Sequence, residues 1–257
     1  MPIIYILGMA DIFESDDNST PLTPEEREGL KPKWITLRRE LNEFETRNIL
    51  DAEMWLATHK LMCIMMPIDS NPADVKDAVK LAETLDLRYL VVDCSNSFHE
   101  TVDELERQGV TLDALSKSNL KVRIRMTILY AYGQTHRSLV LGTDNADERY
   151  TGYFTKYGDG AADLLPIVYL TKGEVVAAAK IKGVPDYLAE RVPTAGLFEG
   201  QTDEVEMGVK YKDLDDFLLG KEIDPKVKER IEHLHRISEH KRAPIPTPIE
   251  YIRDYEK

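Results

Sequence analysis

The chain has 257 residues, of which 42% are hydrophobic and 31% charged, and its formal net charge is −13. This balance is typical of a folded globular protein, and the acidic charge argues against nucleic acid as the main partner. The sequence contains neither a basic leader nor an apolar stretch near the roughly 18 residues of a membrane span, so we expect a cytoplasmic protein without a membrane partner.

The first sixty residues predict one strand followed by charged, mostly helical sequence. Residues 2–8, PIIYILG, form a short apolar run that predicts a strand, and the acidic segment Asp11–Thr20 predicts a loop. Thr23 and Glu26 form a capping box, which predicts the start of a helix.

Short apolar runs alternate with helical patterns from Leu61 onward. Strands are predicted over residues 61–66, 88–93 and 138–143. Helices are predicted from Asn71, over 101–108, over 111–132, from the capping box Thr171–Glu174, and over 224–240. The alternation predicts the α/β class, with a parallel sheet flanked by helices on both faces and ligands beyond the carboxyl ends of its strands. Cys63 and Cys94 lie in apolar runs and are expected to be buried free thiols.

The segment Leu141–Asp163, LGTDNADERYTGYFTKYGDGAAD, follows the last predicted strand and has poor periodicity after Tyr150. A plain solvated loop is the common explanation, but so long a loop in a compact domain is itself a hint of function. The segment supplies a hydroxyl, carboxylates, an ammonium group and glycines that permit close approach of the backbone to a ligand. Carboxylates near phosphates usually act through Mg²⁺, and lysine suits a phosphate as a point charge.

Four blocks, in order along the chain, resemble blocks of the NAD synthetase family. They are SNLKVRIRM (Ser118–Met126), the segment Leu141–Asp163, PTAGLFEGQTDEVEMGVKY (Pro193–Tyr211) and SEHKRAPIPTP (Ser238–Pro248). The likeness extends from about residue 61 to the C-terminus. We therefore expect a single NAD synthetase-like domain over residues 1–257, with residues 1–60 divergent from the family.

The resemblance implies a Rossmann-like ATP-pyrophosphatase fold of the adenine-nucleotide alpha-hydrolase type. It also implies a ligase that converts deamido-NAD, ATP and ammonia into NAD, AMP and pyrophosphate through an adenylate intermediate, with Mg²⁺ as cofactor. Glutamine dependence would need a further amidohydrolase domain, for which this chain is too short. The family further implies a homodimer, for which the apolar helical stretch Leu120–Tyr132 offers enough surface, although burial within one subunit explains that stretch equally well.

The resemblance assigns roles to individual residues. Glu148 matches a Mg²⁺ ligand. Contacts to ATP are implied for Thr143, Lys172 and Thr194. Contacts to deamido-NAD are implied for Arg123, Lys156, Asp163, His240 and Lys241. Taken singly, each has a plainer explanation, such as a surface ion pair for Arg123 or a cation at a helix C-terminus for Lys241, but together they fall in register with the family.

The family signature S-G-G-x-D-S, expected after the first strand, is absent from the sequence. The nearest candidates, Tyr5–Ser15 and Arg47–Lys60, lack the glycine pair that lets a loop wrap a phosphate. A divergent loop, a degenerate segment and a frame error upstream of about Leu61 all stay open. Two other functions stay open as well: a catalytically impaired nucleotide-binding paralogue, and another ATP-pyrophosphatase such as a GMP synthetase or a tRNA-modifying enzyme.

Overall fold

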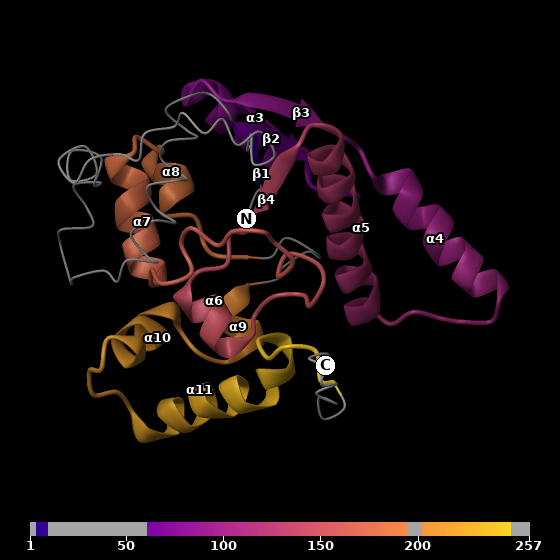
Figure 1. Ribbon diagram of the computed structural model, residues 1–257. Coiled ribbons are helices and arrows are strands. Elements are labelled where there is room, and N and C mark those ends of the chain that lie inside the picture. The colour runs from indigo at the N-terminus through magenta and orange to yellow at the C-terminus, as the bar shows by residue number, and fades with distance from the viewer. Residues whose placement is uncertain (1–3, 10–60, 195–201, 248–257) are drawn as a thin grey trace, which may run out of the picture.

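The computed structural model describes residues 4–9, 61–194 and 202–247, and within them four strands form a sheet in the order β3-β2-β1-β4. Figure 1 shows this sheet at one end of the molecule, with the helices arranged around and beyond it. The strands are β1 (Ile4–Met9), β2 (Leu61–Met65), β3 (Arg88–Val91) and β4 (Ser138–Leu141).

Strand direction confirms the predicted α/β class and corrects one part of it. β2 and β3 are parallel, whereas β1 is antiparallel to both β2 and β4, so β2, β3 and β4 share one direction and β1 opposes them. The prediction of a wholly parallel sheet is therefore wrong for β1. It depended on helices that cross between consecutive strands, as α3 (Pro72–Thr84) does between β2 and β3. The connection from β1 to β2 includes the predicted loop and helix of residues 11–60, which lie outside the described residues.

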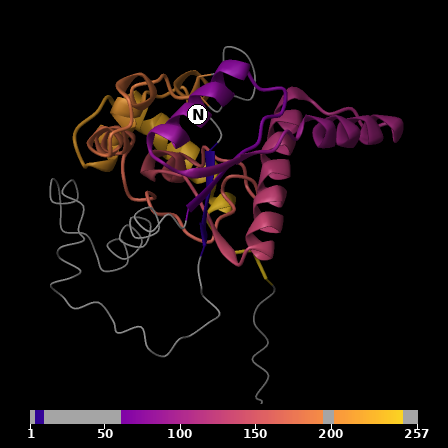
Figure 2. The ribbon, with the colours of Figure 1, turned by 90° about the horizontal axis from the view of Figure 1, so that it is seen from above.

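Helices cover both faces of the sheet, as the alternation predicted. α3 packs its buried Ala78 and Ala82 against Met65 on one face. On the other face, Met62 and Ile64 of β2 join a larger core with α4 (Ser95–Arg107) and α5 (Ala114–Thr135). Figure 2 shows α4 and α5 on one side of the strands, away from α3.

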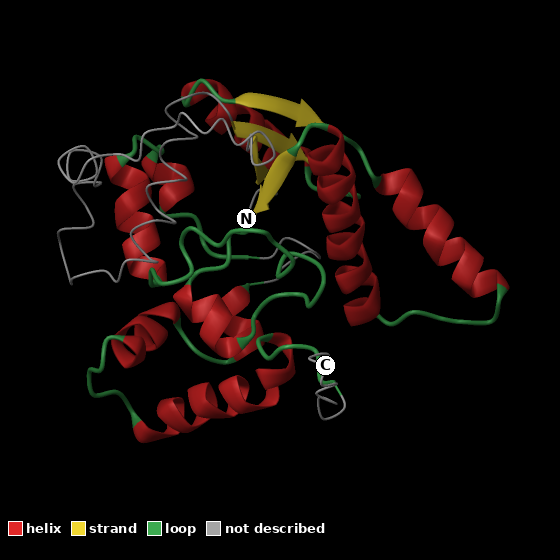
Figure 3. Cartoon of the chain, in the orientation of Figure 1, coloured by secondary structure: helices red, strands yellow, loops and turns green. Residues whose placement is uncertain are grey.

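A second group of helices, beyond the end of β4, has its own core. It contains α6 (Ala146–Thr151), α9 (Asp203–Met207), α10 (Tyr211–Leu218) and α11 (Pro225–Ile237), followed by the short turn η2 (Glu239–Lys241). Met207, Leu214 and Ile231 are buried at its centre. Figure 3 shows long loops between this group and the sheet, and α7 (Lys172–Ile181) and α8 (Asp186–Ala189) lie to one side of them.

Three of the predicted helices begin at the predicted residue, and each start is capped by a side chain. The Asn71 side chain accepts from the Ala73 amide, Asp224 accepts from the Lys226 amide, and Thr171 and Glu174 form the predicted box. The segment Leu141–Asp163, in contrast, is not one continuous loop, because α6 lies within it. A helix of six residues is too short to produce a visible period, although Asn145 and Glu148 form a capping box that marks its start.

Both cysteines are buried and free, as predicted. The helices of the described chain include none that is long and apolar enough to cross a membrane.

Candidate functional site

The start of α6 fixes the position of Glu148 just beyond β4. The Asn145 side chain accepts from the Glu148 amide at 2.9 Å, and Glu148 Oε2 accepts from the Asn145 amide at 3.0 Å. Gly152 ends the helix with φ +69°, in the left-handed conformation that glycine adopts most easily. This reciprocal cap occupies one carboxylate oxygen of Glu148 and leaves Oε1 to face other groups.

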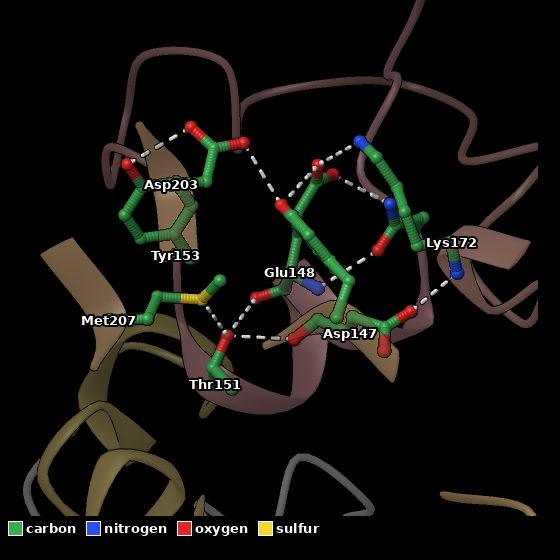
Figure 4. A network of polar contacts seen from close by, with 9 residues as sticks. Asp147, Glu148, Thr151, Tyr153, Lys172, Asp203 and Met207 are labelled. Atoms are coloured by element: carbon green, nitrogen blue, oxygen red, sulfur yellow. Dashed lines mark hydrogen bonds and ion pairs between the residues drawn. The ribbon is translucent and has the colours of Figure 1, made fainter. Parts of the chain in front are cut away.

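Glu148 and Lys172 form an ion pair at the centre of the site (Figure 4). Lys172 Nζ lies 3.4 Å from Glu148 Oε1, and the two side chains are only 11% and 13% exposed. The ammonium also lies over the Tyr211 ring, 4.8 Å from its centroid. The structure thus brings together Glu148 of α6, expected to bind Mg²⁺, and Lys172 of α7, one of the three residues expected to contact ATP.

Tyr211 connects this pair to α9, and Tyr153 binds carboxylates of the same helix. The Tyr211 hydroxyl donates to Asp203 Oδ2 at 3.0 Å and lies 3.5 Å from Glu148 Oε1. Tyr153 donates to Glu206 at 2.6 Å and lies 3.2 Å from Asp203 Oδ1. Burial raises the pKa of both phenols, so they stay protonated and act as donors to the surrounding carboxylates.

Buried carboxyl groups surround the start of α6. Burial, together with Asp159 and Glu148, raises the pKa of Asp144 well above its ordinary value. Burial and then Asp215 raise the pKa of Asp147 to about 8, and burial raises that of Asp159 to about 6. Negative charge is therefore in excess here, which favours a proton or a bound cation.

Asp147 and Asp215 hold the first turn of α7. Asp147 Oδ2 accepts from the Lys172 amide at 2.7 Å, and Asp215 Oδ2 accepts from the Gly173 amide at 2.9 Å. Asp147 is wholly buried. Neither residue was identified from the sequence, because the contacts join three separate helices.

Arg123, Lys156 and His240 form a second group of candidate residues. Arg123 Nε donates to the Lys156 carbonyl at 3.3 Å, and Lys156 Nζ donates to the His240 carbonyl at 2.5 Å. The group joins α5, the loop after α6 and η2. Three of the residues expected to contact deamido-NAD are therefore adjacent in space.

Lys241 anchors the loop after α6 from the C-terminal side. Its ammonium donates to the carbonyls of Gly152 and Phe154 at 2.7 and 2.6 Å. Burial lowers the pKa of this lysine. Arg242 adds bonds to the carbonyls of Arg149 and Tyr150 at 3.2 and 3.1 Å.

The other candidates are more scattered. Asp163 accepts from the Val140 amide at 2.8 Å and from the Tyr130 hydroxyl at 3.3 Å, which ties the end of its loop to β4 and α5. Thr143 is half-buried between β4 and α6, and Thr194 is half-buried beside Pro193. The Pro193 carbonyl accepts from the Asp203 amide at 3.1 Å, which places Thr194 near the start of α9.

A local sequence signal marks the start of α6, although a loop was predicted there. The pattern Asn145-x-x-Glu148 marks the start of α6 in the same way that Thr171-x-x-Glu174 marks α7. No comparable local pattern marks Asp147, Asp203 or Tyr211, since each acts through contacts with another element.

The described side chains contain no group of three His, Cys, Asp or Glu residues arranged to hold a metal ion by themselves. Mg²⁺ at phosphate sites commonly takes some of its ligands from the substrate's phosphate oxygens.

Comparison with known proteins identifies the same family that the sequence blocks resemble. The sequence model of the NAD synthase family matches residues 49–245. The NH(3)-dependent NAD(+) synthetase of Alkaliphilus metalliredigens is 46% identical over 193 residues, which cover 72% of this chain and 78% of that protein. The enzyme of the same name from Mesoplasma florum is 43% identical over 190 residues, which cover 74% of this chain and 78% of that protein.

A solved structure is similar as well. The NMN synthetase of Francisella tularensis aligns with a TM-score of 0.69 and 41% identity, covering 73% of this chain and 78% of that chain.

Proposed function

We infer that this chain, which belongs to the NAD synthase family, is an ammonia-dependent NAD synthetase. The reaction consumes deamido-NAD, ATP and ammonia and yields NAD, AMP and pyrophosphate. The observation that carries this proposal is the Glu148–Lys172 pair at the end of β4, within a stretch that matches the family. It offers a carboxylate for a metal and an ammonium for phosphate side by side.

The first step joins two anions. The nicotinate carboxylate of deamido-NAD attacks the α-phosphorus of ATP, the bond to the pyrophosphate oxygen breaks, and an acyl adenylate forms. Cationic groups must offset the repulsion and the charge that develops on pyrophosphate. We assign this role to Lys172, whose poorly hydrated ammonium would exchange Glu148 for a phosphate oxygen, with Thr143 and Thr194 as further ATP contacts.

The second step forms the amide. Ammonia attacks the acyl carbon, AMP leaves with the electrons of the C–O bond, and the nitrogen loses a proton. The Arg123, Lys156 and His240 group supports a binding site for deamido-NAD, because Lys156 could exchange the His240 carbonyl for an anionic oxygen. We place Asp163 and Lys241 at the edges of the same site.

Mg²⁺ would supply positive charge and Lewis acidity at the ATP phosphates. The donor set fits a metal completed by phosphate oxygens and water. Glu148 Oε1 lies beside Lys172, and Asp144 Oδ2 is buried and has no hydrogen-bond partner within the part of the chain that the structure describes. We propose Glu148 as the protein ligand.

The test is a coupled assay of NAD formation from deamido-NAD, ATP, ammonium and Mg²⁺, with wild type and Glu148→Gln compared. Glutamine can keep the capping bond to the Asn145 amide, so the substitution removes charge and preserves α6. Turnover should fall about a hundredfold or more, as when a charge-stabilising group is removed.

Glu174→Gln is the matched control. Glu174 occupies the same capping-box position in α7, accepts from the Thr171 amide at 2.8 Å, and has no assigned role. Its turnover should stay within about twofold of wild type. Absence of wild-type turnover together with measurable ATP binding would instead support the impaired paralogue.

A second candidate substrate is the mononucleotide, favoured by the likeness to the Francisella NMN synthetase. An enzyme of that kind would amidate nicotinate mononucleotide by the same two steps. The ratio of kcat/KM for deamido-NAD and for nicotinate mononucleotide decides between them. A higher value for the mononucleotide would replace the first proposal.

We also propose that residues 1–257 form one domain and that the protein is a cytoplasmic homodimer that binds neither nucleic acid nor membranes. The strongly acidic charge supports the exclusion of nucleic acid. The apolar side chains of Leu120–Tyr132 pack largely within the subunit's own core, so they do not by themselves support dimer formation. Light scattering during gel filtration tests the homodimer.

A further inference from the structure

The first turn of α7 is held by its own N-cap and by side chains from two other helices. A helix begins with N–H groups that have no partner within the helix. In α7 the Lys172 amide donates to Asp147 of α6, the Gly173 amide donates to Asp215 of α10, and the Glu174 amide donates to Thr171. One hydroxyl suffices to cap many helices, so the two carboxylates do more than complete a local cap. They join α7 to two other helices.

The same two helices supply the groups that face the Lys172 ammonium. On α6, Asp147 binds the Lys172 backbone and its neighbour Glu148 faces Nζ at 3.4 Å. On α10, Asp215 and Tyr211 are four residues apart and so share a face. Asp215 binds Gly173, and the Tyr211 ring lies under Nζ at 4.8 Å.

Gly173 is required by this arrangement. A Cβ at this position would lie 2.5 Å from Asp215 Oδ2, a distance that ordinary contacts do not reach. Any side chain here would push the carboxylate off the amide. The dipeptide Lys172-Gly173 therefore combines the ammonium of the site with the space that its backbone support needs.

We propose that Asp147 and Asp215 are positioning residues that clamp the start of α7 and so keep Lys172 aligned with Glu148 for the ATP phosphates. This proposal rests on the function inferred above. The clamp acts on the backbone, and the chemistry belongs to the side chains. Its loss should weaken ATP interactions selectively, because the hydrogen bonds described for the Arg123, Lys156 and His240 group join α5, the loop after α6 and η2, and none of these is α7.

The experiment compares Asp215→Ala, Asp215→Asn and Gly173→Ala with wild type. For each, KM for ATP, KM for deamido-NAD, kcat and the melting temperature are measured, with ATP affinity determined independently by calorimetry. Asp215→Ala should raise KM and Kd for ATP about tenfold, since misplacement of a positioned group has effects of this size. KM for deamido-NAD should change little. Asp215→Asn keeps an oxygen acceptor for the Gly173 amide and should recover most of the loss.

Gly173→Ala separates positioning from general stability. Alanine is the better helix former, so α7 itself should not weaken, yet the added methyl displaces Asp215 and KM for ATP should rise as in Asp215→Ala. This variant also keeps the test decisive if Asp215→Ala fails to fold.

Asp216→Ala is the matched control. Asp216 is the next residue of α10 and bonds to Lys212 and Lys221, both at 2.6 Å, on the surface. It should leave every kinetic constant unchanged. Unchanged ATP constants in Asp215→Ala and Gly173→Ala, with only the melting temperature altered, would overturn the clamp.

The two proposals can fail separately. A wild-type protein that binds ATP without forming NAD would refute the synthetase, and calorimetry on the same variants would still decide the clamp. A wild-type protein that binds no ATP would overturn both.

Discussion

Gly152 and Gly208 provide an unusually well matched pair of helix ends. Gly152 ends α6 and Gly208 ends α9, both with φ 69° and ψ 25°. An alanine at either position bears the cost of the left-handed conformation, about 1–2 kcal/mol. Only at position 152 does the new methyl also collide, because its Cβ would lie 2.2 Å from Ser238 Cβ. At position 208 the nearest atom is Arg230 Nε at 3.6 Å.

The expected magnitudes follow from that difference. Gly208→Ala should destabilise the protein by about 1–2 kcal/mol. Gly152→Ala should add a cost of about 1–3 kcal/mol for the steric overlap. The difference between the two changes in the free energy of unfolding isolates the steric overlap. The backbone strain and the loss of unfolded-state entropy are shared by both Gly→Ala changes and therefore cancel.

Urea unfolding followed by circular dichroism measures both free energies. The third and fourth variants are Ser238→Gly alone and Gly152→Ala with Ser238→Gly. Ser238→Gly also removes the bonds of a buried hydroxyl, so the cost of Gly152→Ala is measured within the Ser238→Gly background, where it should fall toward that of Gly208→Ala. If Gly152→Ala and Gly208→Ala agree within about 0.5 kcal/mol, a typical error of additivity, the close approach of α6 to the end of α11 is not as described.

Three further outcomes are expected. Lys241→Met should lower the free energy of unfolding by about 2–4 kcal/mol, because two charge-assisted bonds to the Gly152 and Phe154 carbonyls disappear. Urea unfolding measures this loss. A loss no larger than that caused by Lys212→Met, at an exposed lysine, would contradict it. Burial raises the pKa of the Cys63 thiol to about 11, so the thiol is protonated at pH 8. Iodoacetamide should therefore modify Cys63 far more slowly in the folded protein than in the protein unfolded by urea. Equal rates in the two states would show that Cys63 is accessible. Chelation of Mg²⁺ by EDTA should abolish NAD formation without changing the circular dichroism spectrum, and added Mg²⁺ should restore NAD formation. Turnover that persists in EDTA would refute a metal at Glu148.

Local sequence signals predicted local structure well. Asn71, Asp224 and the Thr171–Glu174 box each start a helix where their side chains can accept backbone N–H groups. Such caps act over three residues, so neighbours along the chain suffice to identify them. The helix α6 is the complementary case, because its six residues are too few to show a helical period and only the cap at Asn145 marks its start.

The arrangement of the candidate site depended on contacts that local patterns do not encode. The resemblance to a family placed Glu148 and Lys172 among the site residues, but their contact follows from how α6 and α7 pack. Asp215 supports the same helix from a distant part of the chain, where its neighbour Asp216 forms ordinary surface ion pairs. Two adjacent aspartates of one helix thus have different roles, which composition and spacing do not distinguish.

Lys241 holds the loop after α6 and Arg242 holds the end of α6 itself, which bears on how the protein is made. Translation delivers a chain from its N-terminus, and early segments can fold before later ones emerge. The sheet and the two helices α6 and α7 are complete in sequence before residue 238 is added. Lys241 and Arg242, added later, bind carbonyls of Gly152 and Arg149, which were synthesised long before them. The candidate site is therefore among the last parts of the described fold to be completed during synthesis, and a nascent chain that already has its sheet would not yet hold this loop in position.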